Sequence, residues 1–188
     1  MRVPVLDNGG QWTHREYRVL RELGAESRIV PNTVRLEELD ADAIVLSGGA
    51  LSLEGTDAPL GRVGEWIDAV DVPVLGICVG HQFLARHFGG AVARAASPEF
   101  GRVAVEIERA DDRIFRGVPG KLTVWSSHND EVVRLPEGWT ALAHSATCRV
   151  QAMAHPTRAL WGVQFHPEVE HTEHGREILA NFLAAARR

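Results

Sequence analysis

The chain has 188 residues, of which 45% are hydrophobic and 24% are charged, and its formal net charge is −5. This composition is typical of a soluble globular protein, and a negative charge without a basic cluster argues against a nucleic-acid-binding surface. No apolar run reaches the ~20 residues of a membrane span and the N-terminal residues lack a signal-peptide core, so we expect a cytoplasmic protein without membrane contact.

The first half of the sequence alternates short apolar runs with amphipathic runs. Strands are predicted at 2–7, 27–32, 42–49 and 73–77, and helices at 11–23, 60–70 and 81–88. Gly24 and the pair Gly89–Gly90 follow two of these helices, and glycine is a frequent helix stop. Such alternation predicts a parallel sheet with helices on both faces.

The second half contains shorter strands separated by turn residues, and then a closing helix. Strands are predicted at 101–110, 121–127, 131–136, 139–145, 150–156 and 160–165. An amphipathic helix is predicted at 174–188, and Thr172 is a candidate for its N-cap. We therefore predict a single domain over residues 1–188, of the α/β class. Its open, mostly parallel central sheet has helices on both faces and antiparallel additions from the second half.

Cys78 lies where the strand at 73–77 meets the helix that follows, between Gly76 and Gly80. A sharp strand-to-helix turn with glycines on both sides is the pattern of a nucleophile elbow, and the start of a helix favours a thiolate. The alternative is a small buried side chain that packs as a hydrophobe. We prefer that second interpretation for Cys148, and expect both thiols to be free in a reducing compartment.

A cysteine nucleophile needs a base and a group that orients the base. His166 follows the apolar strand at 160–165, and Glu168 comes two residues later. These residues predict a triad of Cys78, His166 and Glu168. Alternatively, the segment is only a polar loop before the last helix. His81 is an alternative partner for the thiol, but it lies only three residues further on, at the start of the same helix, and is interpreted as a residue at the rim of the site.

The same segment also permits a metal-binding alternative. Its candidate ligands are His166, Glu168, Glu170, His171 and His174. Their spacing matches no zinc signature, so no metal is predicted.

Acyl transfer also needs hydrogen-bond donors for the oxyanion. The amide of Val79, directly after the cysteine, is one candidate. The predicted strand at 42–49 ends in Gly48–Gly49, and Gly49 is the second candidate. The alternative for this glycine pair is an ordinary turn.

Three motifs resemble those of the class I, triad-type glutamine amidotransferases, which have a flavodoxin-like fold. They are SGG at 47–49, GICVGHQ at 76–82 and GVQFHPE at 162–168. Longer similarity at 5–32, 124–139 and 165–175 resembles one branch of that family, the glutaminase subunits of two-subunit, archaeal-type GMP synthases. The resemblance covers essentially the whole chain.

The resemblance implies roles for individual residues. Cys78 is the expected nucleophile, His166 the base and Glu168 its partner, with oxyanion amides from Gly49 and Val79. The implied glutamine-binding residues are Gln82, Ser127, His128, Asn129 and Asp130. Without the resemblance, 127–130 is interpreted as a polar turn between strands. Two residues depart from the family pattern: Ala50 stands where proline is usual, and Asn129 where many relatives have glycine.

The resemblance also implies a partner. The sequence has neither a Walker A motif nor the SGGxDS motif of ATP pyrophosphatases, so a separate ATP-pyrophosphatase (synthetase) subunit is expected to bind ATP, magnesium and XMP. No cofactor is expected in this chain, whose substrate is glutamine. The alternatives are a stand-alone cysteine hydrolase of γ-glutamyl compounds, an amidotransferase subunit of another synthetase, a non-catalytic subunit, and a metal hydrolase.

Overall fold

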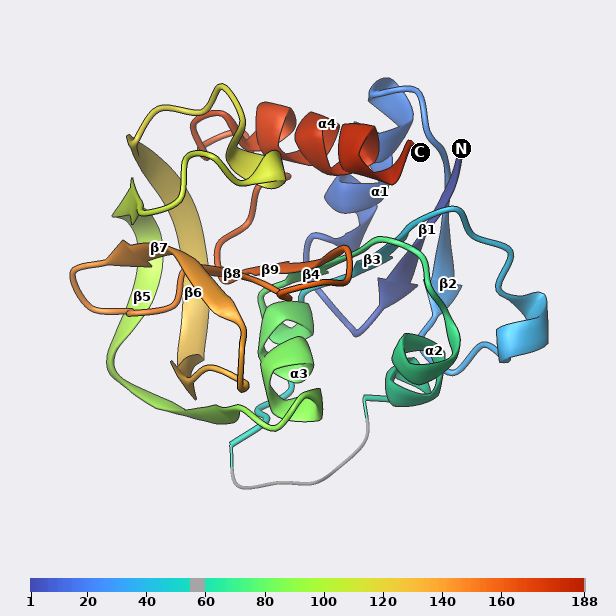
Figure 1. The fold of residues 1–188 in the computed structure, drawn as a ribbon, viewed down its shortest axis with the longest axis horizontal. Coiled ribbons are helices and arrows are strands. Elements are labelled where there is room, and N and C mark those ends of the chain that lie inside the picture. Colours follow the sequence, from blue (N-terminus) through green and yellow to red (C-terminus); the bar gives the residue numbers. More distant parts are fainter. Residues whose placement is uncertain (55–59, 188) are drawn as a thin grey trace.

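The computed structural model describes residues 1–54 and 60–187. All strands of this part belong to one sheet with the order β2-β1-β3-β4-β9-β8-β7-β5-β6. Helices lie on both faces of its parallel part (Figure 1). The predicted fold class is therefore confirmed.

The parallel part of the sheet contains the four strands of the first half and one strand from the second. These are β1 (Arg2–Asp7), β2 (Glu26–Pro31), β3 (Ile44–Leu46), β4 (Val74–Ile77) and β9 (Leu160–Val163). The antiparallel part contains β5 (Ala91–Ile107), β6 (Lys121–Arg134), β7 (Thr140–Ser145) and β8 (Ala152–Ala154). Because β9 returns beside β4, the residues after these two strands meet at one edge.

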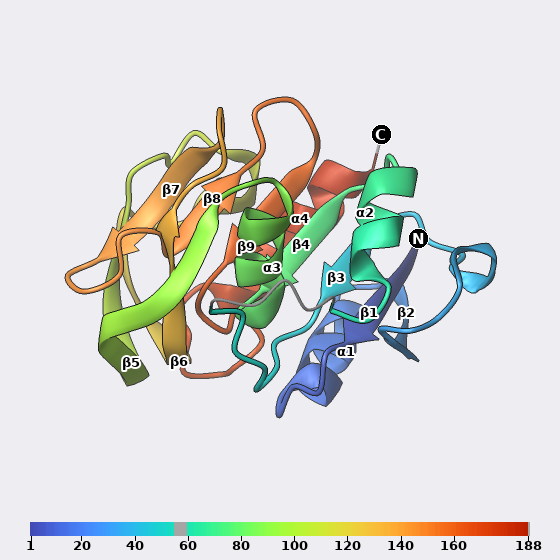
Figure 2. The same cartoon turned by 90° about the horizontal axis from the view of Figure 1, so that it is seen from below.

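Helices α1 (Thr13–Glu22) and α4 (Gly175–Ala186) cover one face of the sheet. Helices α2 (Val63–Ala69) and α3 (Val79–His87) cover the other, as the second view shows (Figure 2). Single 3₁₀ turns, η1 (Leu36–Glu38) and η2 (Arg113–Phe115), lie in the connections. Within the described ranges, no helix has the length and apolar character needed to cross a membrane.

The central strands are buried on both faces, which explains their continuous apolar runs. All residues of β3, β4 and β9 are buried. One apolar cluster, which contains Phe182 and Phe115, packs under α4, and the other, which contains Trp66 and Phe83, packs under α2 and α3. The strand ends that carry the candidate site are thus held between two packed layers.

Two boundaries in the second half differ from the prediction. Residues 121–134 form one continuous strand, so 127–130 is not a turn, and β5 begins at Ala91 rather than at residue 101. Burial alternates along β6, and its polar side chains find partners on the inner face. Long pairing between β5 and β6, with two register shifts, extends both strands beyond their apolar runs.

The predicted cap of the last helix is wrong. Helix α4 begins at Gly175, and His174 occupies the N-cap position with a left-handed φ of 56°. The Thr172 hydroxyl donates instead to the carbonyl oxygen of His166 at 2.7 Å and accepts from the amide of Trp125 at 2.9 Å. Thr172 therefore fixes the backbone that carries His166. The predicted end of this helix, Arg188, lies outside the described residues, as does Gly55 after the altered glycine-rich loop.

Candidate active site

A cavity of about 460 Å³ opens at the carboxyl ends of the parallel strands, where α/β proteins bind ligands. Its wall brings together residues that are far apart in the sequence. They include Gly48, Cys78, Gln82, Ser127, Asp130 and His166. Gly48 follows β3, Cys78 follows β4, and His166 lies shortly after β9.

Cys78 occupies a strained backbone position between β4 and α3. Its φ of 51° and ψ of −107° lie where side chains other than glycine are rarely found. A Cβ on Gly76 would come 2.6 Å from the backbone of Gly80, and a Cβ on Gly80 would come 2.6 Å from the carbonyl oxygen of Leu46. Both glycines are therefore required for the close approach of strand and helix, and the predicted elbow is present.

His166 is held in place through its backbone and its ring. Its amide donates to the carbonyl oxygen of Trp125 at 2.9 Å, and its Nδ1 lies 2.8 Å from Oε1 of Glu168. The ring of Trp12 contacts the imidazole edge-on, with 4.4 Å between the centroids. Because Nδ1 is bound to the carboxylate, Nε2 is left for the thiol.

Cys78, His166 and Gly48 are close neighbours. A Cβ on Gly48 would come 3.1 Å from Cε1 of His166 and 3.6 Å from Cβ of Cys78. Burial alone would lower the pKa of His166, but the charge of Glu168 and hydrogen bonds with Cys78 and Glu168 raise it to about 10. The imidazole is therefore protonated at neutral pH.

The loop after β1 and the loop after β3, both of which contain glycines, pack closely against each other at the edge of the cavity. A Cβ on Gly10 would come 2.5 Å from the carbonyl oxygen of Gly48, and a Cβ on Gly49 would come 2.4 Å from the carbonyl oxygen of Asn8. The Asn8 side chain also donates to the carbonyl oxygen of Ser47 at 2.8 Å. The loop after β3 is thus fixed by the loop after β1, beside the thiol.

Comparison with known proteins assigns this arrangement to a family. The sequence model of the glutamine amidotransferase class-I family matches residues 4–186. The chain belongs to the class I glutamine amidotransferase family.

Similarity to individual members extends over nearly the whole chain. One subunit of the glutamine-hydrolyzing GMP synthase of Thermoplasma acidophilum is 52% identical over 97% of this chain and 92% of its own length. The protein of the same name from Thermococcus kodakarensis is 50% identical over 96% of both chains. A solved structure from Thermoplasma acidophilum, also described as a GMP synthase subunit, has a TM-score of 0.90 and 50% identity, covering 99% of this chain and 94% of its own.

Gly49 and Val79, the residues predicted to supply the oxyanion amides, lie close to one another. A Cβ on Gly49 would come 3.0 Å from Cγ1 of Val79, which begins α3 directly after Cys78. The amide of Gly48, by contrast, already donates to Oε1 of Glu16 at 3.3 Å. Gly49 and Val79 therefore remain our predicted donors.

The predicted glutamine-binding residues also border the cavity. The carbonyl oxygen of Ser127 lies 3.9 Å from Sγ of Cys78, and Asn129 lies on the same wall. The side-chain nitrogen of Gln82 donates to the carbonyl oxygen of Asp130 at 2.7 Å, and the carboxylate of Asp130 accepts from Ser52 at 2.5 Å. Any contact that these residues make with glutamine remains a prediction.

The ring of His128 is buried, and both of its nitrogens have partners within the protein. Its Nε2 lies 2.9 Å from Oε2 of Glu99, and its Nδ1 lies 3.0 Å from the carbonyl oxygen of Asp130. The Glu99 carboxylate also accepts from Gln151 at 2.6 Å. His128 therefore fixes the β6 backbone, which agrees with a contribution of this segment through its main chain.

The interpretation of His81 as a rim residue is wrong. Its ring is completely buried between α3 and β9, where a Cβ on Gly162 would come 2.5 Å from Nδ1. Burial lowers the pKa of His81 to about 3, so the ring is neutral. Cys148 is buried as predicted, burial raises the pKa of its thiol far above the usual range, and both cysteines are free.

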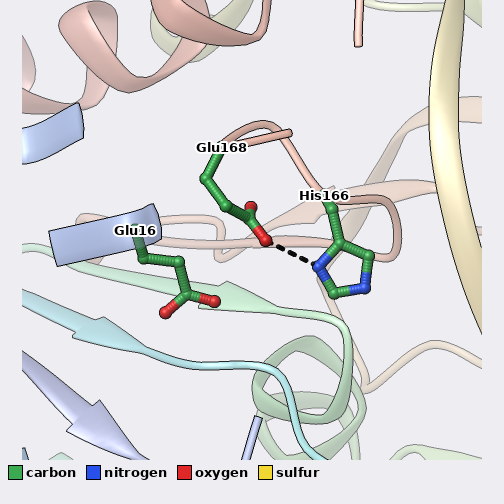
Figure 3. A group of neighbouring side chains, drawn as sticks. All are labelled: Glu16, His166 and Glu168. Carbon is green, nitrogen blue, oxygen red and sulfur yellow. Dashed lines mark hydrogen bonds and ion pairs between the residues drawn. The ribbon is translucent and has the colours of Figure 1, made fainter. Parts of the chain in front are cut away.

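The five candidate ligands of the metal-binding alternative, between His166 and His174, do not form one cluster. His171 pairs with Glu170 at 3.8 Å, and His174 pairs with Glu177, both at the surface. His166 and Glu168 instead meet Glu16 of α1, which sequence reasoning missed (Figure 3). A glutamate on an amphipathic helix is normally a solvent-facing residue, so the sequence carries no signal for this position.

Proposed function

We propose that this chain is the glutaminase subunit of a two-subunit GMP synthase. It hydrolyses glutamine to glutamate and ammonia, and a separate ATP-pyrophosphatase subunit uses the ammonia to convert XMP to GMP. The strained Cys78 beside the buried His166–Glu168 pair is the observation that carries the glutaminase activity. Nearly full-length similarity to proteins named as one subunit of glutamine-hydrolyzing GMP synthases supports the assignment of the complex.

In the proposed reaction, the Cys78 thiolate attacks the carboxamide carbon of glutamine. The amides of Gly49 and Val79 donate to the oxyanion, and His166 transfers its Nε2 proton to the leaving ammonia. The resulting thioester is attacked by water, whose proton goes to His166, and the C–S bond breaks to release glutamate and the thiolate. The chain's own side chains and backbone amides supply the nucleophile, the proton donor and the oxyanion donors of this reaction, and we assign no cofactor to it.

The synthetase half of the reaction is assigned to the partner. ATP, magnesium and XMP are proposed to bind there, and the partner receives ammonia from the cavity. In the loop that carries Gly49, Ala50 replaces the usual proline, and proline restricts backbone freedom. We therefore propose that partner binding orders residues 50–54, which follow the fixed glycines, and raises a weak basal glutaminase activity.

The test is glutamate release by the purified chain, alone and with the synthetase subunit, XMP, ATP and magnesium. We expect a faster rate in the complete mixture and GMP formation from glutamine. Equal rates in both mixtures would contradict the partner-dependent activation, and ready hydrolysis of larger γ-glutamyl compounds without a partner would favour a stand-alone hydrolase.

A further inference from the structure

Glu16 is a buried carboxyl group that the proposed mechanism does not use. It projects from α1 and is only 1% exposed. One side-chain oxygen or nitrogen from each of Glu16, His166 and Glu168 lies within 4.8 Å of the others (Figure 3). A second carboxyl group therefore stands beside the pair that controls the proton of the imidazole.

The hydrogen bonds of these carboxyl groups are incomplete if both are ionised. Oε1 of Glu16 accepts from the amide of Gly48, and Oε1 of Glu168 pairs with Nδ1 of His166. The Oε2 atoms of both glutamates are buried and have no partner among the described residues. Two carboxylates cannot bond to each other, whereas a carboxylic acid and a carboxylate can, because the acid supplies a donor.

We propose that Glu16 is a positioning residue, held as a neutral carboxylic acid, that ties the Gly48 amide to the His166–Glu168 pair. This inference rests on the proposed glutaminase function. The acid O–H faces the Glu168 carboxylate, while the other oxygen accepts from Gly48. Glu16 thereby connects the loop of the oxyanion donors to the groups that move the proton.

The surroundings of Glu16 favour the neutral acid. Burial raises its pKa well above the ordinary value of a glutamate, and the charge of Glu168 raises it further. The amide of Gly48 and the charge of His166 act in the opposite direction, and Asp7 at the end of β1 adds to the increase. The titratable groups that act on the pKa of Glu16 are thus Glu168 and Asp7, which raise it, and His166, which lowers it.

Ionisation of Glu16 would change the reaction. A second negative charge would hold the proton more tightly on His166 and would repel Glu168 from its position. Proton transfer to ammonia would then slow as the pH rises. Glutamine at this position reproduces the neutral acid, since its NH₂ can donate to Glu168 and its oxygen can accept from Gly48, but it cannot ionise.

The experiment compares the pH dependence of glutaminase kcat for the wild type, Glu16→Gln and Glu16→Leu, each as the full chain with its partner. Glu22→Gln is the matched control, because Glu22 lies on the same helix and pairs with Arg176 at the surface. In mildly acidic buffer, we expect kcat of Glu16→Gln to lie within about threefold of the wild-type value. As the pH rises, the ratio of the kcat of Glu16→Gln to that of the wild type should increase. Glu16→Leu should lose on the order of tenfold or more in kcat with a smaller change in KM.

A second readout does not depend on activity. Infrared difference spectra should show the C=O band of a buried carboxylic acid in the wild type and in Glu22→Gln, and its loss in Glu16→Gln. Coinciding pH profiles for the wild type and Glu16→Gln, or the absence of this band, would overturn the inference. If the wild type hydrolyses no glutamine, the proposed function fails, while the infrared band still decides the state of Glu16.

Discussion

Nδ1 of His166 lies 2.8 Å from Oε1 of Glu168, and the two side chains are 5% and 0% exposed. Such a buried charge-assisted hydrogen bond sets both the orientation and the protonation of the imidazole. The ring is also packed against Trp12. We therefore expect the glutamate to act on the chemistry at Cys78 through His166.

Replacement of Glu168 by glutamine should lower kcat by about 100-fold or more, because the acid–base group His166 would lose the partner that orients it. The charge of Glu168 raises the pKa of His166, so the variant should also lose the imidazole proton at lower pH. Steady-state kinetics and NMR titration of His166 measure the two effects. Glu170→Gln, at an exposed carboxylate two residues away, is the control. An unchanged titration of His166 would refute the assigned role of Glu168.

A diazo-ketone analogue of glutamine should modify Cys78 and leave Cys148 unmodified. The first thiol lines the cavity, whereas the second is 1% exposed and burial raises its pKa. Mass mapping of the labelled chain measures the position of the adduct. Cys78→Ser should abolish labelling and Cys148→Ser should not. An adduct on Cys148 alone would contradict the assignment of the nucleophile.

The parts of this protein that could be predicted depend on local patterns. Cys78 was recognisable because the glycines and the apolar strand beside it determine the elbow within a few residues. The continuity of β6 could not be recognised from the sequence, because its polar residues resemble a turn. They find partners only when β5 and α3 lie beside them. Glu16 was missed for the same reason: its burial results from the segment after β9, about 150 residues away in the sequence.

Gly80→Ala should destabilise the fold by about 1–3 kcal/mol, the usual range for overpacking, and should reduce activity more than stability alone explains. The added methyl group would come 2.6 Å from the carbonyl oxygen of Leu46 and would displace the start of α3 with Cys78. Gly120→Ala is the matched control, since nothing lies within 4 Å of its added Cβ. Urea denaturation and glutaminase assays measure both effects. Equal behaviour of the two variants would mean that the close approach at Gly80 is not required.

Chelation of divalent ions should separate the two halves of the proposed reaction. EDTA should stop GMP formation, because we expect the proposed partner to need magnesium with ATP, but should leave basal glutamate release unchanged. In the proposed mechanism, Cys78, His166 and Glu168 supply the nucleophile and the proton donor for that step. Parallel assays of glutamate and GMP measure the separation. Loss of basal glutamate release that zinc restores would support the metal-hydrolase alternative instead.

The stability of the fold should decrease with pH because of His166. Its folded-state pKa of about 10 exceeds the ordinary 6.5, so the folded protein keeps a proton that the unfolded chain has lost. The resulting stabilisation is complete below about 6.5 and disappears as pH rises toward about 10. The difference in unfolding free energy between the wild type and His166→Asn, from urea titrations, should therefore shrink across this range.

His155→Asn is the control, because the pKa of His155 is shifted in the opposite direction: burial and then Arg158 lower it. The difference in unfolding free energy between the wild type and His155→Asn should therefore stay constant above pH 6.5. A constant difference for His166→Asn would show that the imidazole is not protonated at neutral pH, which would remove the thiolate–imidazolium pair from the mechanism.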